Sequence, residues 1–173
     1  MNIEYKAIHD FCCDELERLF LSVEWSSGHY PDKLVVAMQN FDTVYSAWDE
    51  NKLVGMVCAM DDGIMNAYVH YLLVDPDYHG KTIGRTLINM IKQKYKDYMR
   101  IAVIAYDDET HFYENCGFVK SKDASPMFIT SLWTYIPVYQ TYIFSPRACF
   151  LSLIFCCNFL SVLCAFCFSS KRS

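Results

Sequence analysis

The 173-residue chain predicts a mixed α/β domain built around a mostly antiparallel sheet. Three β-rich runs follow one another with only short polar turns between them, at 43–48, 53–60 and 64–74, and this is the pattern of an antiparallel meander. A helical pattern over 83–96 then leads to a short, wholly apolar run at 101–105. Because a strand, a helix and a further strand in succession form a crossover, the strands at 64–74 and 101–105 should be parallel.

The remaining elements complete the expected order β-α-α-β-β-β-α-β-α-β. They are a strand at 2–7, helices at 10–23 and 31–40, a short helix at 108–115, and strands beginning at Phe118 and spanning 127–133. Proline suits the first helical position, so Pro31 should open the second helix. Gly117 should close the last helix, since glycine readily takes the left-handed conformation at helix ends.

The charged residues divide the chain into two parts. Residues 1–133 carry 12 basic and 20 acidic side chains, a formal charge of −8, whereas residues 134–173 carry three basic side chains and no acidic one. Binding to nucleic acid needs clustered lysine and arginine, which the acidic first part lacks, so no nucleic-acid partner is expected. An acidic surface favours a cationic partner such as an amine, although it also serves solubility.

The cysteine spacing indicates whether the chain binds a metal, and residues 1–17 indicate its cellular compartment. None of the nine cysteines has zinc-type spacing with a matching second pair, so no metal site is expected. Residues 1–17 are polar and charged and lack the apolar stretch of a secretion signal. We therefore expect a reduced, cytoplasmic domain.

A glycine-containing turn between a strand and a helix, within 72–87, is the strongest local signal for a ligand site. Such a junction presents backbone N–H groups at the positive end of a helix dipole, where a phosphate can bind. Gly80 and Gly84 would let the backbone approach a ligand, and Lys81 and Arg85 would add positive charge. Taken alone, the turn favours an ordinary strand-to-helix connection with exposed basic side chains over a ligand site.

Two longer motifs and two short ones give this turn its context. They are Leu-Leu-Val-Asp-Pro-Asp-Tyr-His-Gly-Lys-Thr-Ile-Gly-Arg-Thr-Leu at 72–87, Phe-Tyr-Glu-Asn-Cys-Gly-Phe at 112–118, Ser-Ala-Trp at 46–48 and Lys-Leu-Val-Gly at 52–55. In these motifs the chain resembles the GNAT N-acetyltransferases over about residues 1–130. The resemblance implies helices on both faces of the mixed sheet and one acetyltransferase domain at 1–133.

The resemblance also implies transfer of the acetyl group of acetyl-CoA to a primary amine of a small molecule or peptide. The backbone of Leu72, Leu73 and Val74 would bind the pantetheine arm. The pyrophosphate would lie at the turn formed by His79, Gly80, Lys81, Thr82, Ile83, Gly84 and Arg85. The family's usual turn reads Gln/Arg-x-x-Gly-x-Gly/Ala, so His79 and Thr82 depart from it, and the β-carbon of Thr82 would face the pyrophosphate.

Two residues are candidates for proton transfer. Tyr113 occupies the family's Phe-Tyr position and is expected to be the general acid that protonates the departing thiolate. His70 lies two residues before Leu72, so the two side chains should share one face of the strand, and His70 would be the base. A histidine satisfied within the sheet, a base at Asp61 or Glu24, and a chain of water molecules remain alternatives.

The substrate pocket should draw on Trp25 and Tyr30. Together with His29 they would form an aromatic wall that attracts a cation, or they simply fill a corner between two helices. The acceptor classes left open are an arylalkylamine, a polyamine, an aminoglycoside and a protein amino terminus.

Residues 134–173 are rich in Phe and Cys and differ in composition from the rest of the chain. The run 148–168 has 21 residues without a charge, and as a helix it would extend ~31 Å, enough to cross a bilayer. Three interpretations stay open: a membrane anchor, an aberrant C-terminus produced by translation past a frameshift, and a buried soluble element.

A second hypothesis belongs to a different functional class. The chain would then be a non-catalytic acyl-CoA-binding or interaction module. It would be anchored in a membrane if residues 148–168 cross the bilayer. A homodimer is compatible with either hypothesis. A nucleotide-binding fold is disfavoured because antiparallel strands precede the turn and no Gly-x-Gly-x-x-Gly or P-loop motif is present.

Overall fold

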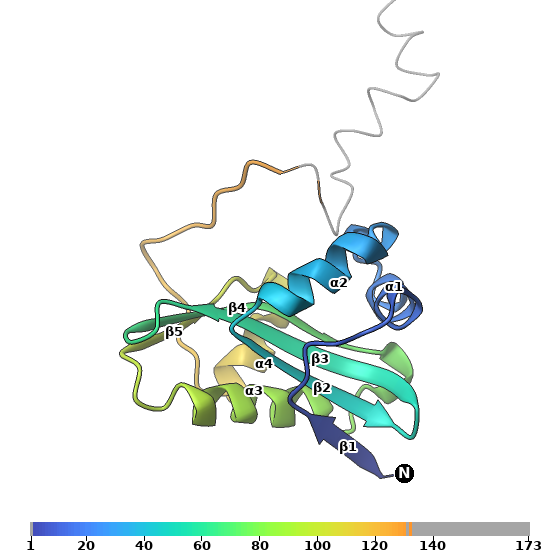
Figure 1. Cartoon of the computed structure of the whole chain (residues 1–173). Helices are drawn as coiled ribbons and strands as arrows, with labels where there is room; N and C mark the ends of the chain where they lie inside the picture. The colour runs from blue at the N-terminus through green and yellow to red at the C-terminus, as the bar shows by residue number, and fades with distance from the viewer. Residues whose placement is uncertain (1, 131, 133–173) are drawn as a thin grey trace, which may run out of the picture. The chain divides into compact units, whose positions relative to one another are not determined.

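A five-stranded mixed sheet organises the protein, in a computed structural model that describes residues 2–130 and 132 (Figure 1). The strands are β1 (Ile3–Lys6), β2 (Thr43–Asp49), β3 (Lys52–Asp61), β4 (Asn66–Val74) and β5 (Arg100–Val103). They lie in the order β1-β2-β3-β4-β5. The first four pair antiparallel, and β4 pairs parallel with β5. The predicted meander and the predicted crossover are both confirmed.

Helices cover both faces of the sheet, as the resemblance implied (Figure 1). Helices α1 (Cys13–Ser22) and α2 (Pro31–Asn40) lie on one face, and α3 (Ile83–Lys94) and α4 (Thr110–Asn115) lie on the other. Three short 3-10 segments connect them, namely η1 (Ser26–His29), η2 (Pro76–Tyr78) and η3 (Asp107–Glu109). Pro31 opens α2 as predicted, and Gly117 follows α4 with a φ of 92°.

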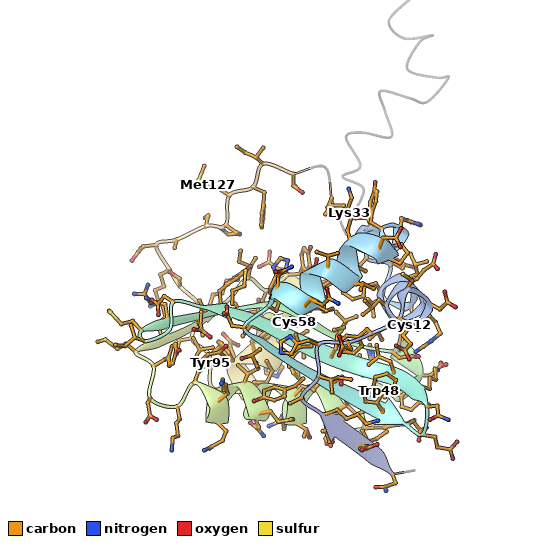
Figure 2. The ribbon with its side chains drawn as sticks, in the orientation of Figure 1. Cys12, Lys33, Trp48, Cys58, Tyr95 and Met127 are labelled. Atoms are coloured by element: carbon orange, nitrogen blue, oxygen red, sulfur yellow. The ribbon has the colours of Figure 1, made fainter. Side chains whose placement is uncertain are left out.

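Two apolar cores form because the central strand β3 is buried on both sides. Met56 and Cys58 of β3 pack with α1 and α2, whereas Val57 and Ala59 pack with α3. Figure 2 shows Cys58 on the α2 side of the sheet and Tyr95, which directly follows α3, on the opposite side. The continuous apolar sequence of β3 therefore has a direct structural reason.

Strands β3 and β4 each contain a bulge that breaks the two-residue alternation of side chains. In the β2–β3 pair, Ala47 is opposite Gly55 and Trp48 is opposite Leu53, so Val54 is the extra residue. In the β3–β4 pair, Cys58 is opposite Tyr71 and Ala59 is opposite Val69, so His70 is the extra residue. Bulges of this kind increase local twist and re-aim side chains.

The end of the described chain differs from the sequence-based expectation. Residues 118–130 form no strand, although strands were expected to begin at Phe118 and to span 127–133. Beyond Phe118, which packs against Tyr113, large apolar side chains stay in solvent: Val119 is 93% exposed and Ile129 is fully exposed. Apolar, β-branched residues do not make a strand unless a neighbouring strand and a core receive them. Trp133 lies outside the described residues.

The tail at 134–173, with the expected span at 148–168, also lies outside the described residues. Within 2–130 and 132, no helix has both the length and the apolar character needed to cross a membrane.

Candidate functional site

Strands β4 and β5 separate after four paired residues, and a cavity opens where they part. Pairing joins only residues 66–69 of β4 to residues 100–103 of β5. The cavity has a volume of about 1450 Å³, and β4, β5, α4 and the segment around η1 all contribute to its lining. The second half of β4 therefore borders open space on the side where its first half pairs with β5.

The bulge at His70 decides which side chains of β4 reach each face. Tyr71 packs against the core beneath α1 and α2, and His70 stacks on Phe41 with ring centroids 5.8 Å apart. Leu72 belongs to the core on the α3 side. His70 and Leu72 therefore do not share a face, and the expectation that they would is wrong because the extra residue shifts the alternation. Both residues nevertheless line the cavity.

The imidazole of His70 lies beside aromatic rings, although the residue as a whole stays exposed, and it lines the cavity. Its ring centroid lies 4.2 Å from that of Tyr71 and 5.8 Å from that of Tyr68. Burial among these rings lowers the pKa of His70 below its ordinary value of 6.5. The imidazole is therefore neutral at neutral pH, which is the form that can accept a proton.

Tyr113 of α4 lines the same cavity with only 6% of its surface exposed. Phe112 and Phe118 meet its ring edge-on, with centroid distances of 5.2 and 5.7 Å. Burial, followed by the negative charge of Glu109, raises the pKa of Tyr113 well above its ordinary value. The phenol consequently stays protonated across the physiological range and can donate a proton.

The turn between β4 and α3 carries the residues expected to hold a pyrophosphate. Its side chains are directed onto the turn itself: a ring nitrogen of His79 lies 2.8 Å from the carbonyl oxygen of Val74. Lys81 donates to the carbonyl of Asp77 at 3.0 Å and lies over the ring of Tyr78. Both side chains are exposed, so they can turn outward toward an anion.

The first turn of α3 has no side-chain cap. Thr82 occupies the N-cap position in the left-handed conformation, with a φ of 62°, and its hydroxyl does not cap the helix. Backbone bonding of the helix starts when the N–H of Thr86 donates to the carbonyl of Thr82. The preceding N–H groups thus point to the helix end, where an anion is favoured. Gly80 has open space where a β-carbon would stand.

The two other glycines near the turn allow α3 to pack closely. A β-carbon on Gly55 of β3 would lie 3.2 Å from the side chain of Ile83, and one on Gly84 would lie 3.4 Å from the ring of Phe112. Gly84 therefore serves packing against α4, in addition to its place in the expected binding turn. The guanidinium of Arg85 donates to the carbonyl of Asn115 at 3.4 Å, so it binds the end of α4 here.

Of the two residues expected to bind substrate, only Trp25 lines the cavity. Its ring centroid lies 5.4 Å from that of Tyr71. Tyr30 is exposed and is covered by the amino group of Lys33, 4.9 Å from its ring centre, so it is not part of this wall. Asp61, one alternative base, accepts hydrogen bonds from Tyr95 and Tyr98 and does not line the cavity.

Tyr68, Tyr71 and Glu109 also line the cavity and were not among the predicted site residues. Burial raises the pKa of Glu109, the charge of Asp108 adds to this, and His79 acts in the opposite direction. The charge of Glu109 therefore interacts both with His79 of the turn and with Tyr113. Its position just before the Phe-Tyr motif was the available signal, but an acidic run such as 107–109 reads as a solvated loop.

The sequence of the region that forms this site matches a known family model. Residues 40–120 match the acetyltransferase (GNAT) domain, and this range contains β2 to α4. The chain carries a domain of the GNAT acetyltransferase family. The matched range includes the turn and Tyr113, so the resemblance predicted from the two longer motifs is confirmed. No cluster of three or more potential metal ligands occurs within residues 2–130 and 132.

Curated relatives of this GNAT domain come from red algae and plants. The chain is 30% identical over 115 residues to an uncharacterised N-acetyltransferase, ycf52, of Pyropia yezoensis, covering 63% of this chain and 66% of the relative. It is 33% identical over 88 residues to GCN5-related N-acetyltransferase 2, chloroplastic, of Arabidopsis thaliana, covering 50% of this chain and 33% of the relative. The alignments thus span two thirds or less of these relatives' own length.

Solved structures share the fold of this GNAT domain. A GNAT family acetyltransferase from Streptococcus pneumoniae superposes with a TM-score of 0.65 at 22% identity, over 75% of this chain and 98% of that one. A ribosomal-protein-alanine N-acetyltransferase from Brucella melitensis superposes with a TM-score of 0.58 at 21% identity, over 75% and 99%. At these identities the likeness establishes the fold of the domain and nothing finer.

Proposed function

We propose that the protein transfers the acetyl group of acetyl-CoA to a primary amine of a small molecule or peptide. One observation carries the proposal. The cavity between the separated strands brings His70, Leu72 and Tyr113 together, and Leu72 leads along β4 into the turn at the uncapped end of α3. A neutral base and a protonated acid thus lie in one cavity, next to a segment suited to a phosphorylated ligand.

The residues around the turn fit acetyl-CoA. Backbone groups of the segment Leu72, Leu73 and Val74 on the side away from β3 would bind the pantetheine arm, and at Val74 the ring of His79 would have to leave the carbonyl first. The pyrophosphate would bind at residues 79–85, where the α3 N-terminus, the open space at Gly80 and the cations Lys81 and Arg85 favour an anion. When bound, acetyl-CoA supplies a thioester as the acyl donor.

Two side chains would handle the protons. The neutral imidazole of His70 accepts a proton, directly or through water, either from the substrate ammonium before attack or from the amine nitrogen as its bond to the acetyl carbon forms. The phenol of Tyr113 donates a proton to the sulfur that leaves as the carbon–sulfur bond breaks. The raised pKa makes Tyr113 a weaker acid than a free phenol, and it also ensures that the proton is present when the sulfur needs it.

The acceptor would enter from the side of Trp25. Its indole and the neighbouring ring of Tyr71 offer aromatic faces to a cation, and the carboxylate of Glu109 adds negative charge to the same cavity. The cavity lining also includes Lys92, Lys96, Arg100 and Lys120, so the aromatic faces, and not the net charge of the lining, support an amine acceptor. The cytoplasmic setting and the homodimer expected from the sequence stay predictions.

A non-catalytic acyl-CoA-binding module is the alternative, and the β-carbon of Thr82 at the binding turn is the observation that favours it. The two functions differ in one assay. The full chain is mixed with acetyl-CoA and a panel of amines, and thiol release is followed while CoA binding is measured separately. Release that depends on the amine supports transfer, whereas binding without release on any amine supports the module.

A further inference from the structure

Asp75 lies buried at the start of the turn, and its carboxylate has three partners. It follows β4 directly and is 4% exposed. One oxygen lies 2.9 Å from the ammonium of Lys52 and 3.2 Å from the guanidinium of Arg18. The other oxygen accepts a hydrogen bond from the N–H of Asp77 at 3.1 Å, which caps η2. The N–H of Asp75 donates to the carbonyl of Val54 at 2.9 Å.

These partners come from parts of the chain that are distant in sequence. Arg18 belongs to α1 and also donates to the carbonyl of Leu53, while Lys52 opens β3. Val54 follows the Gly55–Val74 pair of β3 and β4, so the bond from the N–H of Asp75 to its carbonyl extends that ladder by one residue pair. Asp75 therefore attaches the start of the turn to α1 and to β3 simultaneously.

The attachment extends along the turn toward α3. The carbonyl of Asp75 accepts from the N–H of Tyr78 at 2.8 Å. The hydroxyl of Tyr78 donates to Asp49 at 2.8 Å, and the ammonium groups of Lys52 and Lys81 both lie over its ring. Only three residues separate Tyr78 from the strained Thr82 at the helix end. The position of Asp75 thus determines where the turn begins, and Tyr78 determines its course.

We infer that Asp75 is a positioning residue that holds the turn 76–82 in the conformation that receives the pyrophosphate of acetyl-CoA. This inference rests on the proposed function. Asp75 does not itself face the ligand, because its oxygens are occupied by Lys52, Arg18 and Asp77. Its negative charge pairs with Arg18 and Lys52, whereas Lys81 and Arg85 are exposed and, among the described residues, bond only to backbone carbonyls.

The test compares Asp75→Ala and Asp75→Asn with Asp97→Asn as a control. Asp97 lies after α3, outside the turn 76–82, and is exposed, so its substitution makes the same charge change as Asp75→Asn at a surface position. CoA affinity is measured by calorimetry on the full chain. The kcat/KM for acetyl-CoA is compared with that for S-acetylpantetheine, which has the thioester arm but no pyrophosphate. Hydrogen exchange of residues 76–86 reports the turn without any ligand.

Asp75→Ala should weaken CoA binding about tenfold, the size typical of losing hydrogen bonds to a charged group. S-acetylpantetheine use and the control should change by no more than about twofold, as for an ordinary surface substitution. Asp75→Asn should fall between, since its amide oxygen can still accept from the N–H of Asp77. If Asp75→Ala does not fold, the CoA affinity of Asp75→Asn is the deciding measurement.

Exchange in 76–86 should quicken in the Asp75 variants alone. CoA affinity equal to that of the control, or equal losses with both acyl donors, would overturn the inference and leave the proposed function intact. If the wild-type protein binds no CoA, the proposed function fails, and unchanged exchange in the variants would then overturn the positioning role as well.

Discussion

The ring centroids of His70 and Tyr71 lie 4.2 Å apart, although neighbours in a regular strand point to opposite faces. The bulge of β4 causes this, because His70 is the residue that β3 leaves unpaired. The bulge places the imidazole of His70 at the cavity, beside the ring of Tyr71. Partial burial there lowers the pKa of His70. The proposed base therefore owes both its position and its protonation state to one backbone irregularity.

The first prediction concerns pH. If His70 is the base, kcat/KM should be constant at neutral pH and should fall as pH decreases through a value below 6.5, where the imidazole becomes protonated. His70→Gln should lower kcat/KM about 100-fold or more and remove this acid limb. His111→Gln alters an exposed histidine of α4 and should leave the profile unchanged. An acid limb that persists in His70→Gln would assign the base elsewhere.

The second prediction concerns Tyr113. Tyr113→Phe should lose turnover about 100-fold or more, since the leaving sulfur then lacks its acid. Its stability should change little, because the aromatic packing with Phe112 and Phe118 remains. Tyr45→Phe, at a half-buried position of the same core, serves as the control and should keep full turnover. Circular dichroism and steady-state rates check both statements, and normal turnover in Tyr113→Phe would remove the assignment.

The third prediction concerns the left-handed Thr82. Thr82→Gly should raise stability by up to about 1 kcal/mol, because a β-carbon in this conformation costs roughly 1–2 kcal/mol while glycine costs some entropy. It should also tighten CoA binding, since the β-carbon no longer faces the anion. Thermal unfolding and calorimetry measure the two effects. Thr82→Ala removes the hydroxyl but keeps the β-carbon, so it distinguishes the effects of the two groups. Weaker CoA binding in both variants would mean that the hydroxyl contributes to binding.

The fourth prediction concerns the close approach of α3 to β3. Gly55→Ala should destabilise the fold by about 1–3 kcal/mol and weaken CoA binding, because the new methyl group crowds Ile83 and the carbonyl of Leu73. Gly28→Ala crowds Leu21 at 2.8 Å, beneath η1 rather than α3. It should lower stability and leave CoA affinity as in the wild type. Equal CoA affinity in both variants would contradict the role given to Gly55.

The sequence predicted most of the fold because periodicity and turn residues were unambiguous there. The helix predicted at 31–40 is observed as α2 (Pro31–Asn40), and the crossover strands are parallel as expected. The strand expected at 127–133 is not formed in its described part, because apolar composition does not provide a pairing partner.

The candidate site was only partly accessible from the sequence. The resemblance to the GNAT family led to Tyr113, and the glycines together with that resemblance led to the turn. The bulge at His70 lies inside an apolar run whose sequence gives no sign of it. The role of Asp75 could not be predicted from the sequence, since its partners Arg18 and Lys52 are distant along the chain. Tyr30 was predicted for the pocket from its nearness to Trp25, and the short helix η1 directs it elsewhere.

The most direct measurement follows the acetyl group itself. The full chain is incubated with acetyl-CoA labelled in its acetyl group and with the amine that gives most thiol release, and the products are separated. The proposal predicts that the label appears in an amide of the acceptor in proportion to the thiol released, and that Tyr113→Phe greatly slows its appearance. Label recovered only as free acetate, or retained in acetyl-CoA with every amine, would contradict acetyl transfer by this protein.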